Sequence, residues 1–180
     1  MSVTADLAST PPETAQVLPQ ALTGQIAQRL FGFEADYARS LCCMPMIVRY
    51  RLDVCRIKLA LRDWQRFGLE TRARLILDHN DEPPACRGYR RTLLVAIVEE
   101  ARSRPVRLTQ RASEVWAEPT LPPSVRQYAD DKGFALDGSR SWRDLTVLQR
   151  YALCRLTRAG HENRNFGAAL VEFGLSASAH

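Results

Sequence analysis

Residues 148–175 read LQRYALCRLTRAGHENRNFGAALVEFGL and contain two apolar helical patterns on either side of a polar junction. The first pattern extends from Leu145 to Arg158, and its apolar residues cover most of the circumference of a helix. A helix that is apolar on two sides has to pack against neighbours on both of them. Thr146, followed three residues later by Gln149, is typical of a capping-box start. We therefore expect a central helix at this position.

The second pattern follows the junction His161-Glu162-Asn163 and predicts a helix that ends at Gly174. Asn163 is expected as the N-cap of this helix, and Glu162 would lie near its positive end. His161 and Glu162 also offer a general acid and a general base, which keeps a catalytic interpretation open. We favour the capping interpretation. The buried face of the helix is expected to consist of Phe166, Leu170 and Phe173.

Two earlier segments also carry helical periodicity. Residues 86–101 place apolar side chains on one side of a helix and charged ones on the other, which predicts an amphipathic helix against a core. Pro45 suits the first turn of a helix that extends to about Arg56 and has two apolar faces. Residues 57–62 then alternate with a period of two, and we expect the helix to break there.

The remaining segments set the domain organisation. Residues 1–20 have the composition of a disordered tail, and residues 21–176 are expected to form one helical domain. Residues 103–124 contain four prolines and are interpreted as a surface connection anchored by Trp116. The predicted fold class is all-α, a single compact multi-helix domain with a disordered N-terminal tail.

A faint internal repeat appears when two tryptophans are aligned. The residues of the first copy recur 78 positions later with the same chemical types. Shared helix-start chemistry explains such matches, and we favour it over duplication. The matched sets are Trp64, Phe67, Leu69, Arg72 and Leu75, and Trp142, Leu145, Val147, Arg150 and Leu153.

The charge of the chain is positive but spread along the sequence. The net charge is +5 and only two of the 25 basic residues are lysines. A GC-rich codon usage explains 23 arginines without a functional demand, although guanidinium groups also favour carboxylate contacts with an acidic partner. Diffuse charge makes nucleic acid an improbable partner. No stretch of 18 apolar residues and no signal peptide is recognisable, so we expect no membrane association and a cytoplasmic location.

No motif for catalysis, phosphate binding or zinc binding is recognisable, so we expect a binding protein without a cofactor rather than an enzyme. Most cysteines are expected to be small core residues. The alternative is a metal- or cofactor-binding protein. Its ligands would come from a cluster of Cys43, Cys55, Cys86 and His161. Arg155, on an apolar flank, needs a carboxylate partner or an exposed tip. The candidate partners are Glu34, Asp36 and Asp53.

Several short motifs together resemble the nitrate reductase-associated protein family. They are FGFEADY at 31–37, LCCMPM at 41–46, VRYRLDVCRIKL at 48–59 with Trp64, and the C-terminal run from Leu148 to Phe166 with ALVEFGL at 169–175. Two positions depart from the family pattern. Arg56 stands where the family often has glycine, and Cys42 stands where a basic residue is common.

The resemblance implies a small cytoplasmic accessory protein that supports an assimilatory, molybdenum-dependent nitrate reductase. Its partners would be nitrate reductase or the machinery that matures its molybdenum cofactor. The resemblance brings no established catalytic residues. The positions that it suggests for the partner surface are Phe33, Glu34, Arg49, His161, Glu162, Asn163 and Asn165.

Overall fold

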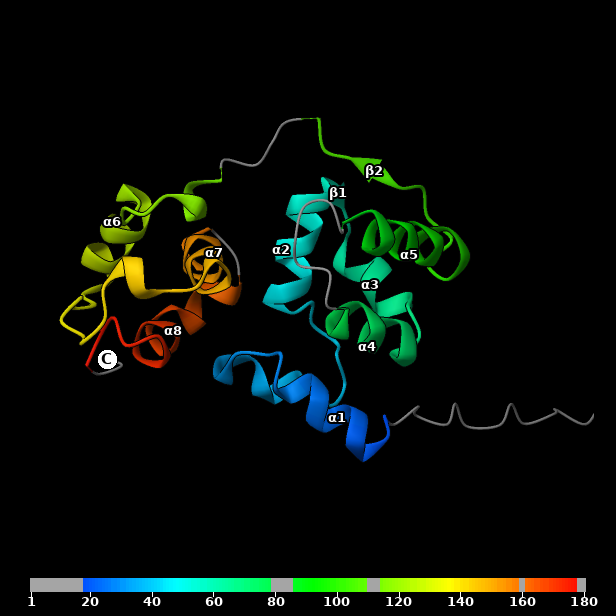
Figure 1. The fold of residues 1–180 in the computed structure, drawn as a ribbon, viewed down its shortest axis with the longest axis horizontal. Helices are drawn as coiled ribbons and strands as arrows, with labels where there is room; N and C mark the ends of the chain where they lie inside the picture. The colour runs from blue at the N-terminus through cyan, green and yellow to red at the C-terminus, as the bar shows by residue number, and fades with distance from the viewer. Residues whose placement is uncertain (1–17, 79–85, 110–113, 159–160, 178–180) are drawn as a thin grey trace, which may run out of the picture.

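The computed structural model describes residues 18–78, 86–109, 114–158 and 161–177, and this part of the chain is mostly helical (Figure 1). The predicted all-α class is confirmed. Short 3₁₀ helices are labelled η. The elements of the first half are α1 (Gln20–Ala27), η1 (Gly32–Tyr37), α2 (Met46–Cys55), β1 (Ile57–Lys58), α3 (Leu61–Arg66), α4 (Leu69–Leu77) and α5 (Cys86–Glu99). They are followed by β2 (Val106–Arg107), η3 (Val115–Ala117), α6 (Pro123–Lys132), η4 (Trp142–Asp144), α7 (Val147–Leu156), η5 (His161–Asn165) and α8 (Phe166–Glu172).

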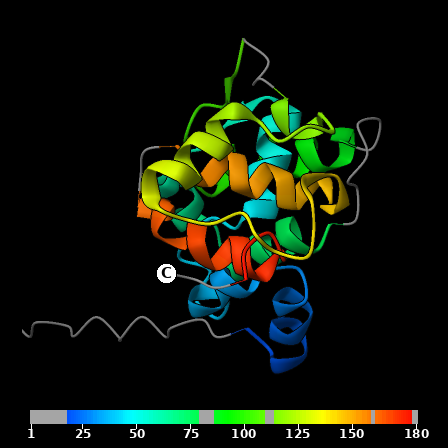
Figure 2. The same cartoon turned by 90° about the vertical axis from the view of Figure 1, so that its left-hand side faces the viewer.

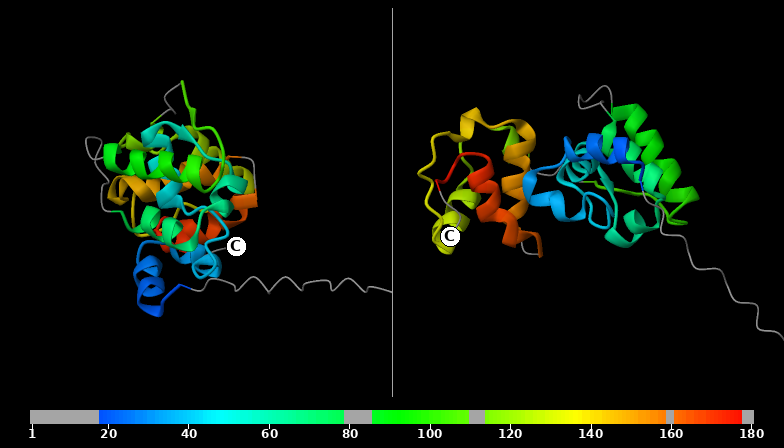
Figure 3. Two further views of the ribbon diagram at one scale, coloured as in Figure 1. Left: turned by 90° about the vertical axis from the view of Figure 1, so that its right-hand side faces the viewer. Right: turned by 90° about the horizontal axis from the view of Figure 1, so that it is seen from below.

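Buried side chains form two clusters, and α2 and α7 lie where the clusters meet. Helices α1 to α5 surround the first cluster, and α6 to α8 surround the second (Figures 1 and 3). In α2, Met46 belongs to the second cluster, whereas Val48 and Leu52 belong to the first. Leu148 of α7 packs against both. The expectation that these two helices are central is therefore confirmed.

Helix α2 ends in a left-handed turn and leads into an extended segment. Arg56 has φ of 59°, a conformation that favours glycine. The glycine that the family often has at this position would favour such a turn, and the turn is present although this chain has an arginine there. Its Nη2–H donates to the carbonyl of Thr109 at 2.6 Å. Ile57 and Lys58 then pair antiparallel with β2, which confirms the predicted break after α2.

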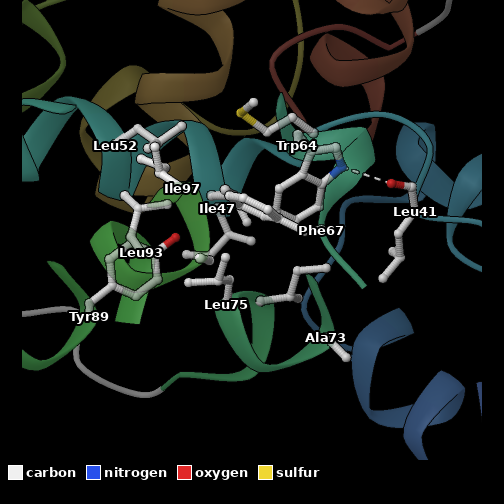
Figure 4. Close-up of a cluster of buried hydrophobic side chains, with 14 of the residues drawn as sticks. Leu41, Ile47, Leu52, Trp64, Phe67, Ala73, Leu75, Tyr89, Leu93 and Ile97 are labelled. Carbon is white, nitrogen blue, oxygen red and sulfur yellow. Dashed lines mark hydrogen bonds between the residues drawn. The ribbon is translucent and has the colours of Figure 1, made fainter. Parts of the chain in front are cut away.

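In the first cluster, an arginine closes the end of a short helix. Trp64 of α3 is fully buried, and its Nε1–H donates to the carbonyl of Leu41 at 2.8 Å (Figure 4). Arg72 of α4 donates from Nε to the carbonyl of Phe67 at 2.8 Å and from Nη2 to that of Gln65 at 2.6 Å. Carbonyls at a helix end lack partners within the helix, and the guanidinium supplies the missing donors.

The second cluster repeats this arrangement. The indole Nε1–H of Trp142 in η4 donates to the carbonyl of Glu118 at 3.1 Å. Arg150 of α7 donates from Nε to the carbonyl of Trp142 at 3.1 Å and from Nη2 to that of Arg143 at 3.0 Å. In both halves the arginine lies eight residues after the tryptophan and reaches back to the end of the short helix. The Nη2 contact repeats, because each arginine binds the carbonyl of the residue after its tryptophan. The Nε contact goes to Phe67 in the first half and to the tryptophan itself in the second.

The preceding helices correspond as well. Helices α2 and α6 each have 10 residues and each follow a proline as N-cap, Pro45 and Pro122. Each ends at a left-handed residue, Arg56 with φ of 59° and Gly133 with φ of 75°. The order of long helix, turn, short helix and long helix occurs twice. This likeness extends beyond the helix-start chemistry that the sequence alone suggests.

Two segment ends lie at other residues than the sequence predicts. The predicted tail at 1–20 lies mostly outside the described residues, but Leu18 is buried and α1 already begins at Gln20. Asn163 was expected to cap the last helix, and this is wrong, because a 3₁₀ turn occupies 161–165 and the N-cap is Asn165. Gly160, where the sequence predicts a left-handed C-terminal cap for the helix at 145–158, lies outside the described residues. The buried face of Phe166, Leu170 and Phe173 is confirmed.

The connection at 103–124 is anchored as predicted. Trp116 in η3 is 3% exposed and its ring packs edge-on against Tyr151, with the ring centroids 5.0 Å apart. Helix α6, which follows the connection, carries Pro123 in its first turn and was not predicted. In the part of the chain that the structure describes, none of the helices has the length and apolar character needed to cross a membrane.

Arg51 connects α2 to the end of α4 from within the core. Its side chain is 2% exposed, and its Nη1–H groups donate to the carbonyls of Leu75 at 2.8 Å and Ile76 at 3.1 Å. Its Nη2–H donates to the carbonyl of Asp78. The guanidinium also lies over the ring of Tyr89, 5.3 Å from its centroid. Arg51 therefore satisfies the carbonyl end of α4 inside the first cluster.

Replacing Arg51 with methionine should lower the free energy of unfolding by about 3 kcal/mol, because buried carbonyls lose a charged donor while side-chain volume is kept. Arg74→Met, at an exposed position of the same helix α4, is the control and should change it by less than about 0.5 kcal/mol. Urea unfolding followed by circular dichroism measures both. Equal midpoints for the two variants would contradict the assigned role of Arg51.

Candidate functional site

Glu34 is the buried carboxylate that joins η1 to the start of α2. It is 1% exposed. Its Oε1 accepts from the hydroxyl of Tyr37 at 2.7 Å and from the N–H of Met46 at 2.8 Å, and its Oε2 accepts from the N–H of Phe31 at 3.1 Å. Burial raises the pKa of the Glu34 carboxyl above its usual 4.5, against these hydrogen bonds and the charge of Arg49. Glu34 thus fixes the entry to α2.

A second carboxylate joins η1 to the C-terminal helix. Glu172 of α8 accepts from the N–H of Gly32 at 2.8 Å and from the N–H of Phe33 at 3.2 Å. Phe31 stacks on Phe33 with centroids 5.3 Å apart, and both rings meet Phe173 edge-on. Figure 2 shows α8 against the segment that carries η1. Two segments from opposite halves of the sequence therefore meet here, while α1, at the start of the described chain, contacts α4.

A tyrosine–aspartate pair crosses between α7 and α2. The hydroxyl of Tyr151 donates to Oδ2 of Asp53 at 2.8 Å. The Tyr151 ring is 1% exposed and also meets Tyr50 edge-on, with centroids 5.4 Å apart. Burial and the neighbouring Asp53 carboxylate raise the pKa of Tyr151 far above its usual value, so the hydroxyl stays protonated as a donor. This pair fixes the register between the two central helices.

A cavity of about 360 Å³ opens beside this pair, between α2, β1 and α7. Its walls combine cationic side chains with apolar ones. Among the described lining residues, Asp53 is the acidic one. The basic lining residues are Arg49, Lys58, Arg155 and Arg158. We call this cavity, with these residues, the junction cleft.

The predicted partner residues fall around α8 and the junction cleft. Phe33 is half-buried against Phe173, and Arg49 lines the cleft, where its Nε–H donates to the carbonyl of Met44 at 2.9 Å. Glu34 is buried, so a partner reaches it only through its neighbours. The residues of η5 lie at the start of α8.

The side chains of the η5 residues are only partly described. Asn163 is half-buried, and its buried Oδ1 has no hydrogen-bond partner within the described residues. Asn165 is half-buried at the N-cap of α8. The side chains of His161 and Glu162 lie outside the described residues. The role of these four residues in partner binding stays a prediction.

The contact of Glu172 is not predicted by the sequence, and Asp53 is predicted only as a candidate partner for Arg155. The structure places the side chains of Asp53 and Arg155 in the lining of the junction cleft. The signal for Asp53 in the sequence was its position as a carboxylate on a helix with two apolar faces. No local signal pointed to Glu172, because the N–H groups that it binds come from the opposite end of the sequence.

The four-residue metal alternative stays a prediction. Cys43 precedes α2 and Cys55 is the last residue of this helix. Cys43 lies beside Cys42, with 4.0 Å between the sulfur atoms. The side chains of Cys86 and His161 lie outside the described residues.

The described residues contain no group of three or more His, Cys, Asp or Glu side chains that could hold a metal ion. What they contain is a helical framework in two halves, with a cationic cleft beside it. Its elements are joined by the buried carboxylate of Glu34, the half-buried one of Asp53 and the exposed one of Glu172. This arrangement defines an all-α protein whose candidate sites lie at the junction of its halves. The chain belongs to the family described as conserved nitrate reductase-associated protein, which it matches over residues 30–173. Comparison with curated proteins and with solved structures gave no match.

The raised pKa of Glu34 predicts how stability depends on pH. Because the pKa of Glu34 is higher in the folded protein than in the unfolded chain, the folded protein binds this proton more tightly. The contribution of Glu34 to the free energy of unfolding is therefore fully present below pH 4.5 and falls as the pH rises through the folded pKa. Glu34→Gln removes the titration. The free energy of unfolding of the wild type minus that of E34Q should therefore be largest near pH 4 and decrease toward pH 8. Urea titrations at both pH values measure it, and a gap that widens with pH would contradict the assignment.

The cysteines should differ in reactivity. Cys42 is exposed, and the Ser40 hydroxyl holds the pKa of its thiol below the usual 9.0, whereas burial raises the pKa of Cys154 to about 11. Because the thiolate is the nucleophile, iodoacetamide at pH 7.5 should alkylate Cys42 at least about tenfold faster than Cys154. Peptide mass spectrometry measures the rates, with Cys42→Ser separating Cys42 from Cys43. Similar rates for Cys42 and Cys154 would show that this part of the fold is wrong.

Proposed function

We propose that the protein is a cytoplasmic accessory protein that binds an assimilatory, molybdenum-dependent nitrate reductase, or the machinery that matures its molybdenum cofactor. It supports the reductase by binding and does not catalyse a step itself. Membership of the nitrate reductase-associated family supports the choice of partner. The surface formed by η1, η5 and α8 supports a binding role.

The observation that carries this proposal is the meeting of η1 and η5 on α8. These two segments lie at opposite ends of the chain, and both contact α8. Phe33 and Glu172 fix η1 there, and the exposed side chains of Arg164 and Val171 lie on η5 and α8. The partner surface is therefore placed on η1, η5 and the outer face of α8.

Binding to purified nitrate reductase tests this surface directly. The double variant Arg164→Glu/Val171→Asp places carboxylates at two exposed positions of the surface and should weaken binding at least about tenfold. The matched control is Arg91→Glu/Val95→Asp on the exposed face of α5, which should bind as the wild type does. Biolayer interferometry measures the affinities, and circular dichroism confirms that both variants are folded. Equal loss in both variants would reject the placement on α8.

A deletion strain tests the function apart from the surface. Removal of the gene should reduce growth on nitrate as sole nitrogen source and leave growth on ammonium unchanged. Re-expression of the wild type should restore growth on nitrate. Unchanged nitrate reductase activity in the deletion strain would reject the proposed function as a whole.

A further inference from the structure

The junction cleft gathers positive charge at the meeting point of the two halves. Four basic side chains and one carboxylate line it, a formal excess of three positive charges among the described lining residues. Arg155 lies in the last turn of α7 and Arg158 follows the end of the helix, and both line the cleft. Like charges gathered in a partly enclosed space repel one another more strongly than in open water. A bound anion would offset this repulsion.

Among the described lining residues, one carboxylate faces four basic side chains, so it balances at most one of their charges. Oδ2 of Asp53 accepts the hydroxyl proton of Tyr151, so one of its two oxygens serves the contact between α2 and α7. Arg49 is held in place by its bond to the Met44 carbonyl, so part of its rotamer freedom is already lost before any ligand enters. Guanidinium groups held in this way match the geometry of phosphate and carboxylate oxygens.

The size and the remaining walls of the cleft restrict the ligand. A volume of about 360 Å³ lies near the lower end of the range for small-molecule sites. The walls away from the charges are apolar and come from Leu52, Ile57, Leu59 and Leu108. A ligand that fits both features has an anionic group at one end and a short carbon skeleton at the other.

We propose that the junction cleft binds a small anionic metabolite through a phosphate or carboxylate group. The oxygens of this group contact Arg155, Arg158 and Lys58, and the carbon skeleton lies against the apolar wall. The cleft is formed by α2, β1 and α7 and is distinct from the partner surface on η1, η5 and α8. Binding of the anion does not require the proposed reductase partner, so the two ideas can fail separately.

Isothermal titration calorimetry of the isolated full-length protein at low ionic strength tests this site. The probes are inorganic phosphate and succinate, with sodium chloride at matched ionic strength as the control for screening. At least one probe should bind saturably at one site, and chloride should not. Binding of phosphate alone identifies a phosphate ligand, and binding of succinate alone identifies a carboxylate ligand. Absence of saturable binding for both probes overturns the proposal.

Variants then place the binding in the cleft. Arg155→Gln/Arg158→Gln should weaken binding of the probe at least about tenfold, because the anion loses charged hydrogen-bond donors. Arg126→Gln/Arg143→Gln removes the same charge from exposed positions on α6 and η4 and should leave the affinity within about twofold. Lys58 is an exposed lining residue, and Lys58→Gln should weaken binding of the probe about threefold. This single variant tests the cleft if the double variant does not fold. Equal affinities for the Lys58 variant and the wild type, or equal losses in both double variants, overturn the proposal.

Discussion

Short helices that end inside the protein leave carbonyl groups without partners, and this structure satisfies many of them with arginine. Arg51 satisfies the end of α4, Arg72 that of α3 and Arg150 that of η4. Each arginine uses more than one N–H and binds more than one carbonyl. Lysine, with a single ammonium on a flexible chain, would not span these carbonyls in a fixed geometry. Codon usage therefore does not fully account for the arginine content, because these arginines have structural roles.

The same contacts explain how two small clusters form one protein. In each half, the arginine of the long helix donates hydrogen bonds to the carbonyls of the short helix before it. Helices α2 and α7 then contact each other. Tyr151 and Asp53 join these two helices, while Glu172 joins η1 to α8. Apolar side chains pack within the two clusters, and charged and polar side chains join the clusters and line the junction cleft. The candidate sites lie there for that reason.

Local patterns in the sequence predicted what depends on local physics. The capping box of Thr146 and Gln149, the buried face of α8 and the amphipathic helix α5 depend on residues a few positions apart, and the structure has them. Helix α6 was missed because its first turn lies in a proline-rich stretch that is typical of a loop, although Pro123 also suits a helix start.

The contacts of the site could not be predicted in this way. Asp53 and Tyr151 lie 98 positions apart, and Gly32 and Glu172 lie 140 positions apart. No periodicity connects residues at such distances. Two of the donors to Glu34 lie only three residues away, but the third, the N–H of Met46, lies twelve residues away and comes near only in the folded chain. The resemblance to the family pointed to Phe33, Glu34 and Arg49, but it did not distinguish the buried carboxylate from the residues at the surface.

We propose that the protein acts through the surface where η1, η5 and α8 meet. Hydrogen–deuterium exchange of the protein, measured with and without nitrate reductase, shows whether this surface is covered by the reductase. We expect slower exchange in residues 31–37 and 161–173 when the reductase is present, and unchanged exchange in α5. Protection that is confined to α5, or exchange that is the same with and without the reductase, would rule this surface out.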